Sequence, residues 1–257
     1  MVLTIDIGNS NIVLGGYIQD KICFTARIAT SRNHEADQYA VELDGILRLH
    51  KVPEKGIEGA IISSVVPSLT PTLQKALRYF TLSQPLLLEL QDAGDLVVDI
   101  EHPAELGMDL LASAIAMHRH GPLPAVIIDM GTATKLIVID KKGALRGVSI
   151  APGLLVSLDA MLGSTSLLHG IALEASPKAI GRNSKQSIQS GVLLGTASML
   201  DGMIDRIESE LNEAPLHITA TGGAAHMVLP YCRHTIEYSD TLLLDGLYLA
   251  YKSRAAK

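Results

Sequence analysis

The chain has 257 residues, of which 47% are hydrophobic and 19% charged, a composition that excludes an intrinsically disordered protein. Its 21 Lys and Arg residues against 27 Asp and Glu residues give a net charge of −6, so no overall basic field attracts nucleic acid. The two cysteines lack a paired or metal-ligand spacing, and no 18-residue uncharged apolar stretch occurs. We therefore expect a cytoplasmic protein with no nucleic-acid and no membrane partner.

The first 120 residues predict alternating strands and helices. Residues 1–19 form two β-branched runs around a Gly/Asn/Ser turn, which indicates a hairpin. The apolar spacing of residues 34–52 is typical of a helix, residues 56–69 predict a buried strand, and residues 70–80 predict a helix with a proline in its first turn. A further helix is expected from about Gly107 to His120, where a Gly-Pro-Leu-Pro segment interrupts the pattern. We place a lobe boundary there, with lobes at residues 1–120 and 121–257.

The second lobe repeats the pattern of the first. Residues 125–147 predict strand, turn, strand, turn and strand, and aligning Asp6 with Asp129 also aligns Gly8 with Gly131. Helices are expected within 150–168, at 183–211 and at 241–255, with a strand and a glycine turn at 216–230. We predict an α/β protein of two similar halves produced by duplication.

Two acidic turns are the main candidates for chemistry. Asp6–Asn11 and Asp129–Thr134 each place a carboxylate at a strand end, followed by Gly and small polar residues whose amides can approach an anion. Either alone is equally well an ordinary hairpin turn. Two such turns at corresponding positions favour a nucleotide between them, with the carboxylates holding Mg²⁺ or another cation directly or through water.

Three further segments are open to two interpretations. Gly222 and Gly223 leave a surface without side chains where adenine or ribose could pack, although an isolated Thr-Gly-Gly is more often a simple turn. The Pro-Gly turn of Ile150–Gly153 could line the same cleft or merely precede a helix. Asp109 could accept a proton from an acceptor hydroxyl, or its negative charge could simply stabilise the helix by lying near the positive N-terminal end.

These segments occur in a recognisable order: DIGNSN, a GxD element at 107–109, DxGTA, IAPG, IGRNSKQSIQSG and TGG. The combination resembles the type III pantothenate kinases over essentially the whole chain. The resemblance implies two ribonuclease H-like lobes of the acetate kinase, sugar kinase, Hsp70 and actin superfamily, and a homodimer that helps to shape the acceptor site. It also implies ATP-dependent phosphorylation of pantothenate to 4′-phosphopantothenate, the first step of coenzyme A biosynthesis.

The resemblance also assigns roles by position. Asp109 corresponds to the general base, and Asp129 to the ligand of a monovalent cation, K⁺ or NH₄⁺. Asp6 is a candidate Mg²⁺ ligand, direct or through water. The positions matching ATP-binding elements are Asp6, Gly8, Asn9, Ser10, Asn11, Thr132, Gly222 and Gly223. The positions matching substrate-binding elements are Gly107, Met108, Leu110 and Ser184.

The sequence departs from the family pattern near the acceptor motif. Leu110 stands where the family has an Arg that could pair with a carboxylate, and Lys135 stands where a Thr is usual. Two alternatives therefore stay open beside a pantothenate kinase. One is a related small-molecule kinase with another hydroxyl acceptor, and the other is a non-catalytic nucleotide-binding homologue.

Overall fold

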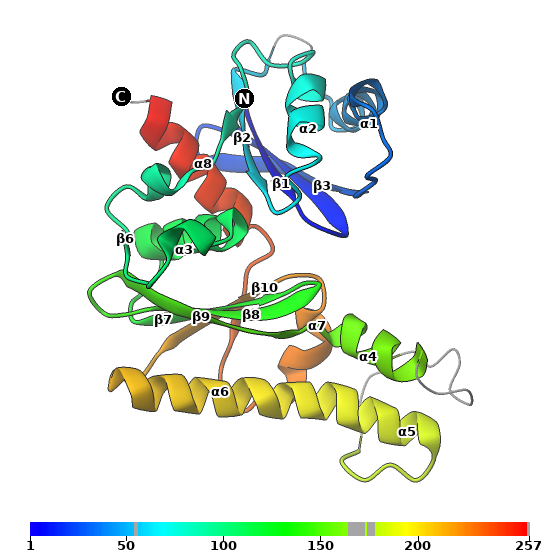
Figure 1. Cartoon of the computed structure of the whole chain (residues 1–257), viewed down its shortest axis with the longest axis vertical. Helices are drawn as coiled ribbons and strands as arrows, with labels where there is room; N and C mark the ends of the chain where they lie inside the picture. The colour runs from blue at the N-terminus through cyan, green and yellow to red at the C-terminus, as the bar shows by residue number, and fades with distance from the viewer. Residues whose placement is uncertain (54–55, 164–172, 174–177, 256–257) are drawn as a thin grey trace. The chain divides into compact units, whose positions relative to one another are not determined.

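The computed structural model describes residues 1–53, 56–163, 173 and 178–255. The chain divides into two compact units (Figure 1). Unit 1 comprises Met1–His120 together with Thr241–Lys257, and unit 2 comprises Gly121–Asp240. The change from unit 1 to unit 2 thus falls at the residue where the helical pattern of the sequence ends, whereas the last segment of the chain returns to unit 1.

Unit 1 is built on a mixed sheet in the order β3-β2-β1-β4-β5. Strand β1 pairs antiparallel with β2 and parallel with β4. The strands are β1 (Val2–Ile7), β2 (Asn11–Ile18), β3 (Lys21–Ala29), β4 (Gly59–Ser64) and β5 (Leu86–Leu87). The central strands β1 and β4 are buried on both faces, as expected for strands covered on both sides.

Unit 2 repeats this topology in the order β9-β8-β7-β10-β11. Strand β7 pairs antiparallel with β8 and parallel with β10, as β1 does with β2 and β4. The strands are β7 (Ala125–Met130), β8 (Ala133–Ile139), β9 (Ala144–Pro152), β10 (His217–Thr221) and β11 (Glu237–Tyr238). Asp6 and Asp129 are each the fifth of six residues in the first strand of their unit. The predicted α/β fold with duplicated topology is confirmed.

The helices of unit 1 follow the predicted pattern closely. They are α1 (Ala36–Leu49), α2 (Thr70–Leu77), α3 (Met108–His120) and α8 (Leu242–Ala255), with strand β6 (Val97–Val98) and two short 3₁₀ turns (Leu90–Ala93, Pro103–Glu105) before α3. A capping box formed by Glu35 and Gln38 starts α1, and Pro71 lies in the first turn of α2. Tyr39 and Leu43 of α1 pack with Leu3 and Ile5 of β1 in one apolar core.

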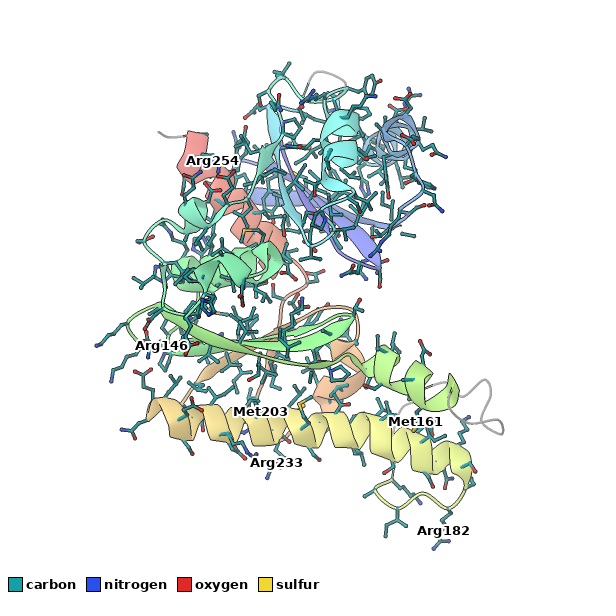
Figure 2. The ribbon with its side chains drawn as sticks, in the orientation of Figure 1. Arg146, Met161, Arg182, Met203, Arg233 and Arg254 are labelled. Carbon is teal, nitrogen blue, oxygen red and sulfur yellow. The ribbon has the colours of Figure 1, made fainter. Side chains whose placement is uncertain are left out.

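Helix α8 lies in unit 1 and not in the second lobe predicted for residues 241–257. It packs against α3 and β1 and buries Leu242, Leu244 and Leu247. Arg254 lies near its end (Figure 2). Its Nε donates to Asp92 Oδ1 over 2.8 Å. Hydrophobic spacing identifies the buried face of a helix but not the unit that covers it, so the sequence pattern could not reveal this return.

The helices of unit 2 cover its sheet. They are α4 (Leu154–Gly163), α5 (Ser184–Gln189), α6 (Gly195–Leu211) and α7 (Ala225–Val228), with a π-helical turn (Ser190–Leu194) joining α5 to α6 and a 3₁₀ turn (Leu229–Tyr231) after α7. Leu200 and Ile204 of α6 share a core with Val126 and Ile128 of β7. Figure 1 shows α6 running along one face of this sheet.

Two further properties concern membranes and thiols. In the described ranges, no helix combines the length and the apolar character needed to cross a membrane. Cys23 and Cys232 are free thiols. Burial raises the pKa of the Cys232 thiol to about 11, so this thiol stays protonated at neutral pH and is a poor nucleophile.

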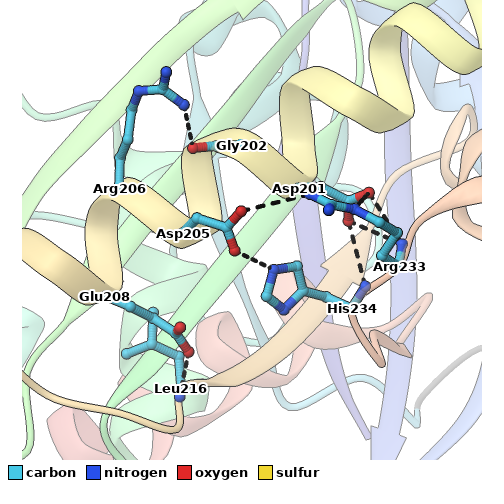
Figure 3. A network of polar contacts seen from close by, with 8 residues as sticks. All are labelled: Asp201, Gly202, Asp205, Arg206, Glu208, Leu216, Arg233 and His234. Atoms are coloured by element: carbon cyan, nitrogen blue, oxygen red, sulfur yellow. Dashed lines mark hydrogen bonds and ion pairs between the residues drawn. The ribbon is translucent and has the colours of Figure 1, made fainter.

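A buried carboxylate anchors the segment after α7 to α6. Asp201 on α6 accepts hydrogen bonds from the backbone N of Arg233, at 3.0 Å to each oxygen, and from the backbone N of His234 at 3.3 Å (Figure 3). Its side chain is only 3% exposed. One helical turn away, the more exposed Asp205 accepts from His234 Nε2 at 2.8 Å, with the donor role depending on the imidazole tautomer.

We expect Asp201→Ala to destabilise the protein by about 2–4 kcal/mol, because it leaves the N–H groups of Arg233 and His234 without their acceptor. Asp205→Ala is the matched control and should cost only about 0–1 kcal/mol, since Asp205 is half exposed. Chemical denaturation of the three proteins measures both values. Equal losses for the two variants would contradict the anchoring role of Asp201.

Candidate active site

The acidic turn of unit 1 joins β1 to β2 and is held by its own backbone. Gly8 N donates to Asn11 O over 3.0 Å, Thr30 Oγ1 donates to Gly8 O over 2.7 Å, and Thr30 N donates to Ser10 O over 3.0 Å. A Cβ at position 8 would lie 2.9 Å from Asn11 O, so the turn requires glycine. The turn is therefore fixed before any ligand arrives.

The residues around this turn present polar groups to solvent. Asn9, Ser10 and Asn11 are exposed, and Arg32 Nη2 donates to Asn9 Oδ1 over 3.2 Å. Asp6 lies beside Ser63 in the register of β1 and β4, near the carboxyl ends of these two parallel strands. Ligands of open α/β sheets bind at such ends, so the predicted phosphate element stands at the expected edge of this sheet.

The structure brings three sequence motifs of unit 2 together at the corresponding edge. The turn at Gly131 and Thr132 joins β7 to β8, and Gly153 N donates to Thr132 O over 3.1 Å. A Cβ at Gly153 would contact the carbonyl oxygens of Gly131 and Thr132. Gly222 has a φ of +94°, and a Cβ there would lie 2.6–2.8 Å from backbone atoms of Met130.

Close backbone packing thus explains the glycines at positions 153 and 222. Ala224 N also donates to Met130 O over 3.2 Å, which ties the turn after β10 to the end of β7. The DxGTA, IAPG and TGG motifs, which are far apart in the sequence, form one continuous backbone surface in unit 2. Gly222 and Gly223 lie on this surface, next to the strand that carries Asp129.

Asp129 forms an ion pair with Lys135 that the sequence pattern did not predict. Asp129 and Lys135 are direct cross-strand neighbours in the β7–β8 hairpin, and Lys135 Nζ donates to Asp129 Oδ2 over 2.9 Å. The two side chains are 19% (Lys135) and 17% (Asp129) exposed. In the register of this hairpin Met130 pairs with Thr134, which leaves three residues at the turn and places positions 129 and 135 opposite each other.

Asp109 lies in the first turn of α3 and is 7% exposed. Leu110 N donates to Asp109 Oδ1 over 2.9 Å, and Ser113 Oγ donates to the backbone O of Asp109 over 3.1 Å. A Cβ at Gly107 would lie 2.5 Å from Asp109 Oδ1, so glycine leaves room for the carboxylate.

The remaining predicted substrate contacts differ in exposure. Met108 is half-buried at the start of α3, and Leu110 is buried, so α3 presents no cation at position 110. Ser184 is an exposed first residue of α5, on an element separate from the three clustered turns. The side chain of the preceding Asn183 caps this helix by accepting from Gln186 N over 2.9 Å.

The sequence matches a known family over most of its length. The family model described as type III pantothenate kinase matches residues 2–206. The chain belongs to the type III pantothenate kinase family. The predicted family resemblance is thereby confirmed. The family assignment also agrees with the acidic turns and the GxD element at α3.

Curated relatives of this family match the chain from end to end. The type III pantothenate kinase of Thermomicrobium roseum is 40% identical over 254 residues, covering 98% of this chain and 97% of the relative. That of Roseiflexus castenholzii is 35% identical over 252 residues, covering 98% of each. Family membership therefore extends over both units.

Solved structures show the same fold at low sequence identity. The activator of the 2-hydroxyisocaproyl-CoA dehydratase from Clostridium difficile, solved with bound ADPNP, superposes with a TM-score of 0.59 at 12% identity, covering 100% of this chain and 97% of the activator. Component A of the (R)-2-hydroxyglutaryl-CoA dehydratase from Acidaminococcus fermentans gives 0.58 at 16% identity, covering 100% and 99%. These likenesses confirm the predicted actin-like ATPase fold.

Proposed function

We propose that this protein transfers the γ-phosphoryl group of ATP to the primary hydroxyl of pantothenate, giving 4′-phosphopantothenate and ADP. The observation that carries the proposal is membership of the type III pantothenate kinase family over both units. This reaction is the first step of coenzyme A biosynthesis. Phosphoryl transfer depends on positioning and charge stabilisation, and the fixed acidic turns are suited to both.

The acidic turn of each unit is a proposed contact for the phosphates of ATP. In unit 1, the exposed residues Asn9–Asn11 offer backbone N–H and side-chain donors on a rigid turn. In unit 2, Thr132 sits on the β7–β8 turn, and Gly222 with Gly223 supplies a surface free of side chains for the adenosine. Such preformed donors lower the entropic cost of ordering a triphosphate.

Asp6 fits the role of the Mg²⁺ ligand. Mg²⁺ is commonly bound by one or two carboxylates together with substrate phosphates, and Asp6 stands at the carboxyl end of its strand beside a phosphate-binding turn. When bound, Mg²⁺ would neutralise charge on the β- and γ-phosphates. For the K⁺ or NH₄⁺ ion expected at Asp129 the residues fit less well, because Lys135 Nζ already lies 2.9 Å from Oδ2.

Asp109 is the proposed general base, and Gly107, Met108 and Leu110 the proposed pantothenate contacts around it. The carboxylate is held at a helix N-terminus by Leu110 N and has little access to bulk water, which keeps it oriented toward one partner. Its task is to accept the proton of the attacking hydroxyl. Without that acceptance, the alcohol oxygen is a weak nucleophile.

We assign the protein a homodimeric state in the cytoplasm. Ser184 is a proposed substrate contact that remains exposed in its own chain, as a residue contributed to a shared acceptor site must be. Two free thiols agree with a reducing compartment. Sedimentation of the purified protein tests the oligomeric state.

A coupled ADP-release assay, with pantothenate present and absent, tests the proposed function. We expect ADP release to depend on pantothenate, and mass spectrometry to identify 4′-phosphopantothenate as the product. Nucleotide binding without transfer to any acceptor would instead identify a non-catalytic homologue.

The buried, uncharged Leu110 favours one alternative acceptor class, hydroxyl compounds without a carboxylate. Loss of a charged hydrogen bond to a carboxylate commonly costs about 1.5–3 kcal/mol. The assay therefore includes pantothenol, in which an alcohol replaces the carboxylate of pantothenate. Turnover of pantothenol but not of pantothenate would overturn the assignment of the acceptor.

A further inference from the structure

We propose that the ammonium group of Lys135 is the protein's own cation at Asp129, so that catalysis needs no soluble monovalent cation. The inference rests on the proposed function, because it concerns the phosphate-binding edge of unit 2. It starts from the 2.9 Å ion pair between Lys135 Nζ and Asp129 Oδ2. Lys135 thereby acts as a positioning residue for the carboxylate that stands beside the DxGTA turn.

The backbone fixes this cation in place. Asp129 and Lys135 are paired in the antiparallel register of β7 and β8, only one residue from the turn that carries Thr132. Side chains at directly opposite positions of a hairpin project from the same face of the sheet and meet without rearrangement. Both side chains are more than four-fifths buried, so water competes weakly for the ammonium group.

A lysine ammonium group and a soluble ammonium ion offer this carboxylate the same positive charge and the same kind of N–H donor. A lysine ammonium is a compact point charge with three N–H donors, as an ammonium ion is a compact point charge with four. One unit of positive charge at Asp129 is therefore already supplied. A second monovalent cation on the same carboxylate would lie close to a like charge and be repelled by it.

Comparison of the two repeats supports a specific role for Lys135. The residue opposite Asp6 in the corresponding hairpin of unit 1 is Val13, which carries no charge. The lysines of the next turn, Lys141 and Lys142, are exposed, and Lys141 Nζ lies 3.8 Å from Glu213. The residue directly opposite the aspartate is thus a cation in unit 2, Lys135, and an uncharged residue in unit 1, Val13.

The test compares pantothenate phosphorylation in chloride salts of K⁺, NH₄⁺, Na⁺ and tetramethylammonium at equal ionic strength. We expect the wild-type rate to change by less than about twofold between these salts. Lys135→Thr should lose about 10–100-fold in tetramethylammonium, the effect of removing one charged hydrogen bond, and should recover in K⁺ or NH₄⁺. The rate of Lys135→Arg should vary as little between the salts as the wild-type rate does, because arginine keeps the positive charge.

Lys141→Thr is the matched control, since it removes an exposed lysine that pairs with Glu213 in the same unit. It should leave both the rate and the salt response unchanged. A wild-type rate that requires K⁺ or NH₄⁺ would overturn the proposal. So would a Lys135→Thr enzyme that no cation restores, because Lys135 would then act on the phosphates directly.

Melting temperatures in the same salts provide a readout that does not depend on turnover. A cation that binds only the folded protein raises its melting temperature, so K⁺ should stabilise Lys135→Thr relative to tetramethylammonium and leave the wild type unaffected. If no protein phosphorylates pantothenate in any salt, the proposed function fails. The melting temperatures still decide whether Lys135 occupies the cation position, and a K⁺-stabilised wild type would overturn that inference independently.

Discussion

Asp109→Asn is expected to lower kcat for pantothenate phosphorylation by about 10²–10⁴-fold, the usual contribution of a positioned general base. The amide has nearly the shape of the carboxylate, and its oxygen can still accept the hydrogen bond from Leu110 N that starts α3. The helix should therefore remain intact while the side chain loses its capacity to take a proton. Initial rates at saturating ATP and pantothenate measure the effect.

Nucleotide binding separates a chemical role of Asp109 from a structural one. Calorimetric titration with a non-hydrolysable ATP analogue should give wild-type affinity within about twofold, since the acidic turns lie on other elements. Asp44→Asn is the matched control on α1, where the partly exposed Asp44 pairs with Arg48, and it should leave kcat unchanged. A loss of ATP affinity as large as the loss of kcat would show that Asp109 is not a base.

The duplicated fold could be predicted because its signals are local. Strands β1 and β7 begin and end at equivalent positions, with Asp6 and Asp129 in the same place relative to a following glycine. Short-range hairpin and helix patterns fix such elements without knowledge of the tertiary structure. The packing of α8 on unit 1 could not be predicted in this way, because its apolar face would suit the surface of either unit.

The features of the candidate site also separate into those that local sequence patterns predict and those that depend on tertiary contacts. The glycines of the acidic turns and of the TGG motif were identified from the sequence, and for Gly8 and Gly222 the structure supplies the reason in the close approach to Asn11 and Met130. The need for glycine at position 153 depends on a contact between separate turns, which no local pattern reveals. The pairing of Asp129 with Lys135 depends on hairpin register, which became certain only with the strand bounds.

Gly222→Ala is expected to destabilise the protein by about 2–5 kcal/mol, because it combines backbone strain with overpacking. At a φ of +94° an L-residue is strained, and the new methyl group would lie 2.6–2.8 Å from backbone atoms of Met130. For a chain of this size we expect a fall in melting temperature of about 5–15 °C. Calorimetry and denaturant titration measure the two quantities.

The same substitution should weaken nucleotide binding through displacement of β10 from β7. Met130 follows Asp129 directly, so separating the strand ends moves the carboxylate as well as the TGG surface. Gly147→Ala is the matched control in β9, where an added Cβ meets nothing within 4 Å, and its effect should stay within about 0.5 kcal/mol. Gly222→Ala could instead prove as stable as Gly147→Ala and bind ATP equally well. The turn after β10 would then have room for a side chain, and the close-packed backbone surface would not position the nucleotide.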